Sequence, residues 1–85
     1  MSTQVFGFNE LRQILVERAG LSEEDVVDDP DATFDEMGLD SLGLIEVQMA
    51  VREKYGLEVP EEDADRITTV GQAIEYVNQR LAAKA

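Results

Sequence analysis

The chain has 85 residues, no cysteine or histidine, and 19 acidic against 7 basic residues, for a formal net charge of -12. The length fits one domain, residues 1–85, and the missing residue types exclude disulfides, cysteine or histidine zinc sites, and Ser-His-Asp or Cys-His catalysis. We therefore expect no enzyme and no metal site, and the charge disfavours nucleic acid and anionic membranes as partners while favouring basic proteins.

Residues 1–7 lack the basic and apolar runs of a secretory signal, and no stretch of the sequence approaches the length that spans a bilayer. The cytoplasm is therefore the expected location. A first helix is predicted to start after Asn9, a favourable N-cap residue, and to terminate at Gly20. Its apolar residues recur at helical spacing and are Leu11, Ile14, Leu15 and Ala19.

A long loop is predicted over residues 21–40, and loops of this length in small domains are often functional. Its apolar side chains are expected to anchor it to the core; they are Val26, Val27, Phe34 and Leu39. No basic residue occurs between Arg18 and Arg52, where the acidic residues are Glu23, Glu24, Asp25, Asp28, Asp29, Asp31, Asp35, Glu36, Asp40 and Glu46. This acidic run is either a solvated loop or a docking surface for basic proteins.

The second helix is predicted over Ser41–Tyr55, with Gly56 as its terminator, and a short helical turn over residues 61–65. The last helix begins with a capping box formed by Thr69 and Gln72. Its apolar stripe consists of Val70, Ala73, Ile74, Val77 and Leu81. The sequence thus predicts an all-α fold, a small four-helix bundle with three main helices, one short helix and a long loop between the first two.

Ser41 follows Asp40, an N-cap residue type, at the predicted start of the second helix. Its hydroxyl is then expected beside unpaired backbone N–H groups at the positive end of the helix dipole, which favours a bound or covalently attached phosphate. In most Asp-Ser pairs before a helix, however, the serine is only a capping residue. The residue pattern of the helix that follows distinguishes between these two interpretations.

The second helix carries two apolar stripes on nearly opposite sides. One stripe consists of Leu44, Val47, Val51 and Tyr55, and the other of Leu42, Ile45 and Met49 with Glu46 and Glu53 beside them. A helix in so small a domain does not readily bury two opposed faces. Either the long loop covers the second stripe, or that stripe is a partner-binding surface with an acidic rim that begins beside Ser41.

The sequence around Ser41 resembles the phosphopantetheine attachment motif of the acyl carrier protein family, over Phe34-Asp35-Glu36-Met37-Gly38-Leu39-Asp40-Ser41-Leu42 and the following Ile45-Glu46. The resemblance continues through residues 59–70 and 73–77 and covers the chain from Leu11 onward, in order and at the spacing of the family. It implies the fold of an acyl carrier, which agrees with the predicted bundle.

The resemblance also implies a function. Ser41 would receive 4′-phosphopantetheine from coenzyme A through a separate phosphopantetheinyl transferase, and the chain itself would catalyse nothing. Basic patches on this transferase, a malonyl transferase, a ketosynthase and tailoring enzymes would contact the family's partner-facing positions, here Asp40, Leu42, Ile45, Glu46 and Met49. An acyl pocket would be lined by Val47, Val51, Val59, Ala64, Ile67 and Ala73, which are equally compatible with an ordinary core.

Two positions depart from the family pattern. Gly43 stands in the first turns of the second helix, where many relatives have a side chain, and it either admits the arm or a partner close to the backbone or is neutral. Arg66 stands where fatty acid carriers often have lysine, and polyketide carriers often place arginine close to the acyl cavity. As an ordinary surface residue, Arg66 would pair with Asp63 or Glu62.

The opening segment from Leu11 to Gly20, which ends in Arg18-Ala19-Gly20, resembles free-standing carriers of aromatic polyketide synthases. The segment Ile67-Thr68-Thr69-Val70 is equally at home in fatty acid carriers. We favour polyketide biosynthesis, with fatty acid biosynthesis as the alternative. A discrete subunit is expected because the chain begins at a methionine and ends shortly after the last helix, and we expect it to be a monomer.

Three other classes of protein share single features with this sequence. A peptidyl carrier is disfavoured because Gly38-Leu39-Asp40 lacks the two glycines usual before its serine. A calcium loop starting at Asp31 fails because Glu36 stands where the turn needs glycine and Leu42 where the loop needs glutamate. An unmodified helical adaptor, which binds partners through the second helix, remains the alternative outside the carrier class.

Overall fold

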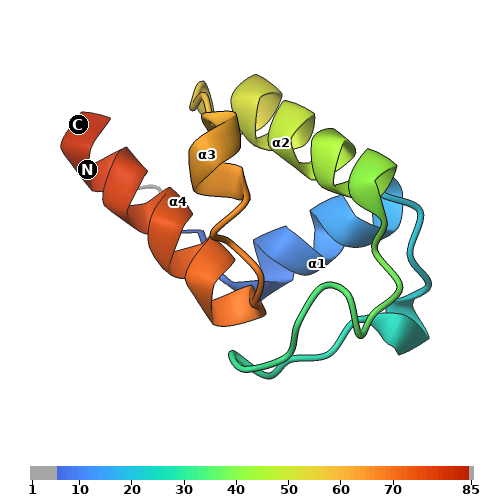
Figure 1. Cartoon of the computed structure of the whole chain (residues 1–85). Helices are drawn as coiled ribbons and strands as arrows, with labels where there is room; N and C mark the ends of the chain where they lie inside the picture. The colour runs from blue at the N-terminus through green and yellow to red at the C-terminus, as the bar shows by residue number, and fades with distance from the viewer. Residues whose placement is uncertain (1–5, 85) are drawn as a thin grey trace.

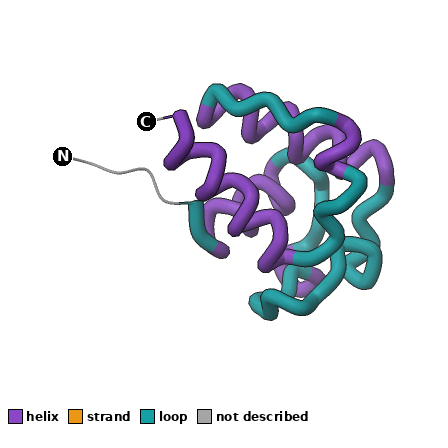
Figure 2. The backbone as a smooth tube through the Cα atoms, turned by 60° about the vertical axis from the view of Figure 1, so that its left-hand side comes forward, coloured by secondary structure: helices purple, strands orange, loops and turns teal. Residues whose placement is uncertain are grey.

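The computed structural model describes residues 6–84, which form α1 (Phe8–Glu17), the 3₁₀ turn η1 (Glu23–Asp25), α2 (Ser41–Tyr55), α3 (Glu61–Ala64) and α4 (Val70–Lys84). Figure 1 shows α3 between α2 and α4, with the long α1–α2 connection at one end of the bundle. This connection is the largest loop segment of the described backbone (Figure 2). The predicted all-α bundle, with three main helices and a short one, is confirmed.

Residues 1–5, most of the segment inspected for a secretory signal, lie outside the described residues, as does residue 85. Within residues 6–84 no strand is present, and the β-type pairing consists of an isolated antiparallel bridge between Thr33 and Thr69. The two longest described helices, α2 and α4, have 15 residues each, and none of the described helices is a candidate membrane span.

The limits of α2 and the start of α4 agree with the prediction because both depend on local signals. Asp40 caps α2 by accepting the backbone N–H of Gly43 at 2.8 Å, and Gly56 ends the helix at a φ of 68°. At α4, the Gln72 N–H donates to Thr69 Oγ1 and the Thr69 N–H donates to Gln72 Oε1, both at 3.2 Å. The predicted capping box is therefore present.

The predicted start of α1 was wrong by two residues, because α1 begins at Phe8 and not after Asn9. The reason is tertiary: Phe6 is fully buried, and the side chain of Asn78 on α4 bonds both its N–H and its carbonyl at 2.8 Å. The turn into the helix therefore falls at Gly7, whose N–H donates to Glu10 Oε1 at 2.8 Å. At the other end, regular helix ends at Glu17.

Gly20 follows that end and has a φ of 81°, the left-handed conformation that glycine adopts most readily. The N–H of Leu21 donates back to the carbonyl of Leu15 at 3.0 Å, which satisfies a carbonyl at the helix end. The predicted role of Gly20 as terminator is confirmed.

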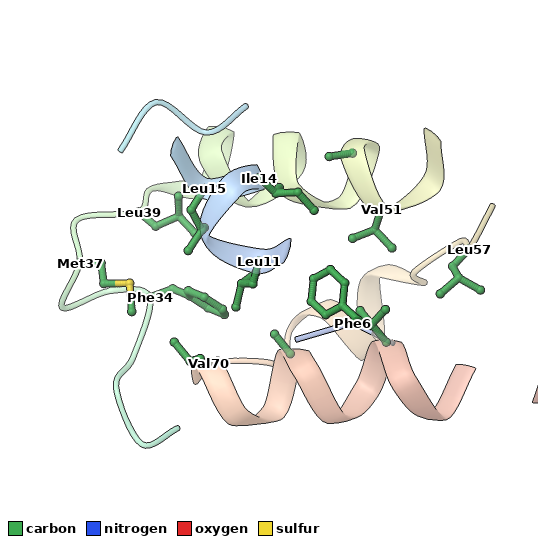
Figure 3. Packing of buried hydrophobic residues seen from close by; sticks show 13 residues of the cluster. Phe6, Leu11, Ile14, Leu15, Phe34, Met37, Leu39, Val51, Leu57 and Val70 are labelled. Carbon is green, nitrogen blue, oxygen red and sulfur yellow. The ribbon is translucent and has the colours of Figure 1, made fainter. Parts of the chain in front are cut away.

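The core lies where the three longer helices and the loop meet, and its buried side chains come from α1, α2, α4 and the second half of the loop, together with Phe6 and Leu57 (Figure 3). Its members are Phe6, Leu11, Ile14, Leu15, Phe34, Met37, Leu39, Ala50, Val51, Leu57, Val70, Ala73 and Val77. Phe6 packs edge-on against Tyr55, with ring centroids 5.5 Å apart. This contact joins the entry of α1 to the end of α2.

The long loop is anchored by the second half of its sequence. Phe34 and Leu39 are buried as predicted, and Val26 packs partly against the core. Val27 was wrongly predicted as an anchor, since its side chain is 46% exposed. Met37 is buried in its place, because the turns after Phe34 fold the chain back onto the bundle.

Three backbone hydrogen bonds of 3.0 Å join the loop to the start of α4. The N–H groups of Gly71 and Val70 donate to the carbonyls of Pro30 and Ala32, and the Phe34 N–H donates to the carbonyl of Thr68. A Cβ at Gly71 would lie 3.0 Å from the Pro30 carbonyl oxygen, so this close approach favours glycine. The segment that leads to Ser41 is thereby fixed to α4.

Candidate functional site

Ser41 is the first residue of α2, and its side chain is exposed. Asp40 performs the capping: its carboxylate accepts the Gly43 N–H at 2.8 Å, and its carbonyl accepts the Leu44 N–H at 3.0 Å. Within residues 6–84 no hydrogen-bond partner is present for the Ser41 hydroxyl. The interpretation of Ser41 as a mere cap residue is therefore wrong, and its oxygen is accessible for chemistry.

The environment of the Ser41 hydroxyl suits a phosphate. The N–H groups of Ser41 and Leu42, in the first turn of α2, have no acceptor in the described part of the chain, as expected at a helix start. These donors and the positive end of the dipole of a 15-residue helix favour a phosphate group there. The residues present therefore fit a phosphodiester attached at Ser41.

The apolar stripe next to Ser41 is open to solvent. The exposed fractions of the Leu42, Ile45 and Met49 side chains are 67%, 50% and 46%. Asp40 is exposed and Glu46 half-buried beside them. We call these five residues, Asp40, Leu42, Ile45, Glu46 and Met49, the outer face of α2. The alternative in which the long loop covers this stripe is wrong.

A salt bridge at the edge of this face was missed by the sequence analysis. Arg18, just after α1, donates to both carboxylate oxygens of Glu53 on α2, at 3.0 and 3.3 Å. This hydrogen bonding lowers the pKa of Glu53 and raises that of Arg18, with Glu46 adding to the shift of Arg18. The partners are far apart in sequence, so no local pattern reveals them.

On the opposite side of α2 lies an apolar cavity of about 50 Å³. All six residues predicted to line an acyl pocket border it: Val47, Val51, Val59, Ala64, Ile67 and Ala73. Sequence reasoning missed other lining residues, namely Phe34, Leu39, Leu44, Gln48, Tyr76 and Val77. Of these, Gln48 and Tyr76 bring polar groups to the lining. Leu39 and Leu44 extend the lining toward the start of α2.

Gly43 is explained by packing. Its Cβ, if present, would lie 2.5 Å from Cδ1 of the buried Leu39 and 3.3 Å from the capping carboxylate oxygen of Asp40. Glycine therefore lets Leu39 pack beneath the first turn of α2. This packing accounts for glycine at position 43 without a close approach of the arm or a partner to the backbone.

Arg66 is exposed, and the pairing predicted for it is absent from the described residues: neither Asp63 nor Glu62 forms a salt bridge with it. The carboxylate of Asp63 instead accepts the Tyr76 hydroxyl at 2.7 Å. This bond crosses from α3 to α4 beside the cavity. Arg66 and Tyr76 both border a surface groove on this side of the bundle.

Comparison with known proteins agrees with this geometry. A family model described as the phosphopantetheine attachment site matches residues 9–77. A solved structure of the 3-oxo-butyl acyl carrier protein from the actinorhodin polyketide synthase of Streptomyces coelicolor is 31% identical, with a TM-score of 0.82, over 99% of this chain and 100% of that chain. The chain belongs to the acyl carrier protein family.

The octanoyl and acetyl forms of the same Streptomyces coelicolor acyl carrier protein are each 30% identical to this carrier, with TM-scores of 0.82 and 0.80. Both comparisons cover 99% of this chain and 100% of the other. The resemblance read from the sequence is confirmed, as is 4′-phosphopantetheine as the cofactor of its family. The chain is therefore a carrier domain.

Proposed function

We propose that this acyl carrier protein holds biosynthetic intermediates on a 4′-phosphopantetheine arm attached at Ser41, in a type II polyketide synthase. The observation that carries the proposal lies at the start of α2. Asp40 caps the helix, so the exposed Ser41 hydroxyl has no hydrogen-bond partner among the described residues. In the attachment step, the Ser41 oxygen loses its proton and displaces adenosine bisphosphate from the phosphorus of coenzyme A.

When attached, the arm supplies a thiol that holds acyl groups as thioesters. The chain's own residues position this arm and present it. Asp40 fixes the first turn of α2, and the cavity behind the helix offers apolar surface to a short acyl group. We propose that the carrier itself is non-catalytic and that residues 1–85 act as one monomeric domain in the cytoplasm.

Partners are proposed to dock on the outer face of α2. Its apolar centre and acidic rim suit a basic patch on a phosphopantetheinyl transferase, malonyl transferase, ketosynthase or tailoring enzyme. The formal net charge of -12 accelerates such encounters by electrostatic steering, which suits brief contacts with several enzymes.

The polyketide assignment is supported by the related carriers from the actinorhodin polyketide synthase, one with a 3-oxo-butyl group that mimics an intermediate. Fatty acid biosynthesis is the second candidate, because apolar side chains make up most of the cavity lining and suit a plain hydrocarbon chain. Loading the carrier and offering it to ketosynthases of the two pathways separates these candidates.

The proposal is tested by incubating the full chain with coenzyme A and a broad-specificity phosphopantetheinyl transferase and measuring intact mass. The wild type gains one phosphopantetheine, and Ser41→Ala gains none. Ser22→Ala, which removes another exposed serine hydroxyl, is the matched control and is loaded like the wild type. A Ser41→Ala variant that still supports synthesis in a reconstituted system, or a wild type that cannot be loaded, refutes the proposal in favour of an unmodified adaptor.

A further inference from the structure

Helix α3 is joined to the other helices by a single side-chain hydrogen bond in the described part of the chain. It has four residues, and Figure 1 shows it between the two 15-residue helices, α2 and α4. The Tyr76 hydroxyl on α4 donates to Asp63 Oδ2 on α3 at 2.7 Å, in a partly buried position. In residues 6–84, no other side-chain hydrogen bond or ion pair joins α3 to another helix.

Tyr76 lies between the cavity and the surface. It borders the apolar cavity, and together with Asp63 and Ile67 it also borders the surface groove. The guanidinium of Arg80 lies 5.6 Å from the centre of its ring. Burial and the bond to Asp63 raise the pKa of Tyr76, so the hydroxyl remains a proton donor at neutral pH. The tyrosine therefore forms part of the wall that closes the cavity between α3 and α4.

The cavity is too small for a long acyl chain. Its volume is about 50 Å³. A cavity of roughly 150 Å³ holds benzene, which has six carbons, so about two carbons fit here. A longer chain requires a wall to move. The long helices α2 and α4 supply buried core residues such as Val51 and Val77, whereas α3 has none, so α3 is the wall that moves at least cost.

We propose that the hydrogen bond between Asp63 and Tyr76 is a latch that holds α3 against α4 and so limits the length of acyl chain that the carrier shelters. This inference rests on the proposed attachment of the arm at Ser41. With the latch closed, an acetyl group fits the cavity. An eight-carbon group either remains outside the cavity or enters it after the latch has opened. Removing the latch therefore increases the sheltered fraction of the eight-carbon group and leaves that of the acetyl group unchanged.

The test uses the full chain loaded with acetyl or octanoyl pantetheine from the corresponding coenzyme A thioester. Cleavage of the thioester by hydroxylamine measures how well the acyl group is sheltered. Tyr76→Phe removes the donor but keeps the ring, and one hydrogen bond corresponds to roughly a three- to tenfold change in population. We expect octanoyl cleavage to slow by that factor in Tyr76→Phe, with acetyl cleavage unchanged.

Asp63→Ala tests the latch from the other helix and gives the same selective slowing for octanoyl. Its matched control is Glu62→Ala, which removes an equal charge from the same turn but no bond to Tyr76, and which behaves like the wild type. Tyr55→Phe controls for the loss of a tyrosine hydroxyl away from the cavity. Backbone amide shifts of Val47 and Ala73 on loading report independently whether the chain enters.

The outcomes separate the two proposals. Octanoyl cleavage that is the same in the wild type, Tyr76→Phe and Asp63→Ala overturns the latch and leaves the attachment site standing. Equal changes for acetyl and octanoyl also overturn it, because a purely structural role does not depend on chain length. A wild type that accepts no acyl-pantetheine at Ser41 refutes the proposed function, and the latch with it.

Discussion

Both faces of α2 carry large apolar side chains, but the two faces have opposite surroundings. On the inner face, Val51 is 3% exposed and borders the cavity, whereas on the outer face Leu42 is 67% exposed. Burial of the inner-face side chains stabilises the folded state. The outer-face side chains contribute in the same way only to a complex in which a partner covers them. Residue type alone therefore does not separate stability from recognition; the position around the helix does.

The largest expected effect comes from truncating one apolar side chain on each face of α2 and comparing the two variants. Val51→Ala removes two buried carbons and should cost about 2 kcal/mol, or roughly 10 °C in melting temperature. Leu42→Ala should change stability by less than about 0.5 kcal/mol but lower kcat/KM of the transferase for the carrier about tenfold, because an apolar contact at the partner interface is lost.

Thermal melts and initial loading rates of both variants check this prediction. The comparison between the faces fails if Leu42→Ala is loaded at the wild-type rate, or if Val51→Ala slows loading as much as Leu42→Ala does.

The next effect is smaller and concerns the buried side of the first turn. Gly43→Ala should destabilise the fold by about 1 kcal/mol, because overpacking against Leu39 costs about 1–3 kcal/mol and the better helix propensity of alanine offsets about 1 kcal/mol of that. Denaturant unfolding measures the difference. In a Leu39→Val background the cost should shrink, because valine lacks the Cδ1 methyl group that clashes. A Gly43→Ala variant more stable than the wild type would show that Leu39 relaxes freely.

The smallest effect lies at the edge of the outer face, in the ion pair of Arg18 and Glu53. Because the pKa of Glu53 is lowered from its usual 4.5, the ionised carboxylate stabilises the folded state. This contribution is complete above about pH 4.5 and is lost as the pH falls through the lowered value. The pKa of Arg18 is raised further, so this residue stays charged throughout.

Glu53→Gln should therefore melt slightly below the wild type at pH 7, and the two should converge in acid. Because both side chains reach solvent, the gap should also narrow in high salt. Glu24→Gln, at an exposed position without an ion pair in the described structure, is the control. A gap that stays constant from pH 7 to pH 3 would contradict the assignment.

The sequence predicted those features that depend on neighbouring residues. The limits of α2 follow from Asp40 and Gly56, and the start of α4 from Thr69 and Gln72, so each was correct. The exposed outer stripe followed from helical periodicity in a domain too small to bury two faces. The predicted pocket lining also borders the cavity, although its role in sheltering acyl groups remains a proposal.

The features that were missed depend on contacts between distant segments. The start of α1 depends on the clamp that Asn78 places on Phe6, and neither residue marks a helix boundary by itself. Met37 is buried in place of Val27 because the turns after Phe34 set the direction of the loop. The reason for glycine at position 43 was not visible in the sequence, because it depends on Leu39 packing beneath the first turn of α2.

The hydrogen bonds from the loop to the start of α4 bear on every enzyme that handles this carrier. None of these three bonds involves a residue of α3, so under the proposed latch α3 shifts for a different acyl group while the approach to Ser41 stays fixed to α4. Under the proposed function, successive enzymes meet the same orientation of the serine whatever intermediate it bears. The docking of partners is then independent of the acyl group, as a carrier that serves several reactions requires.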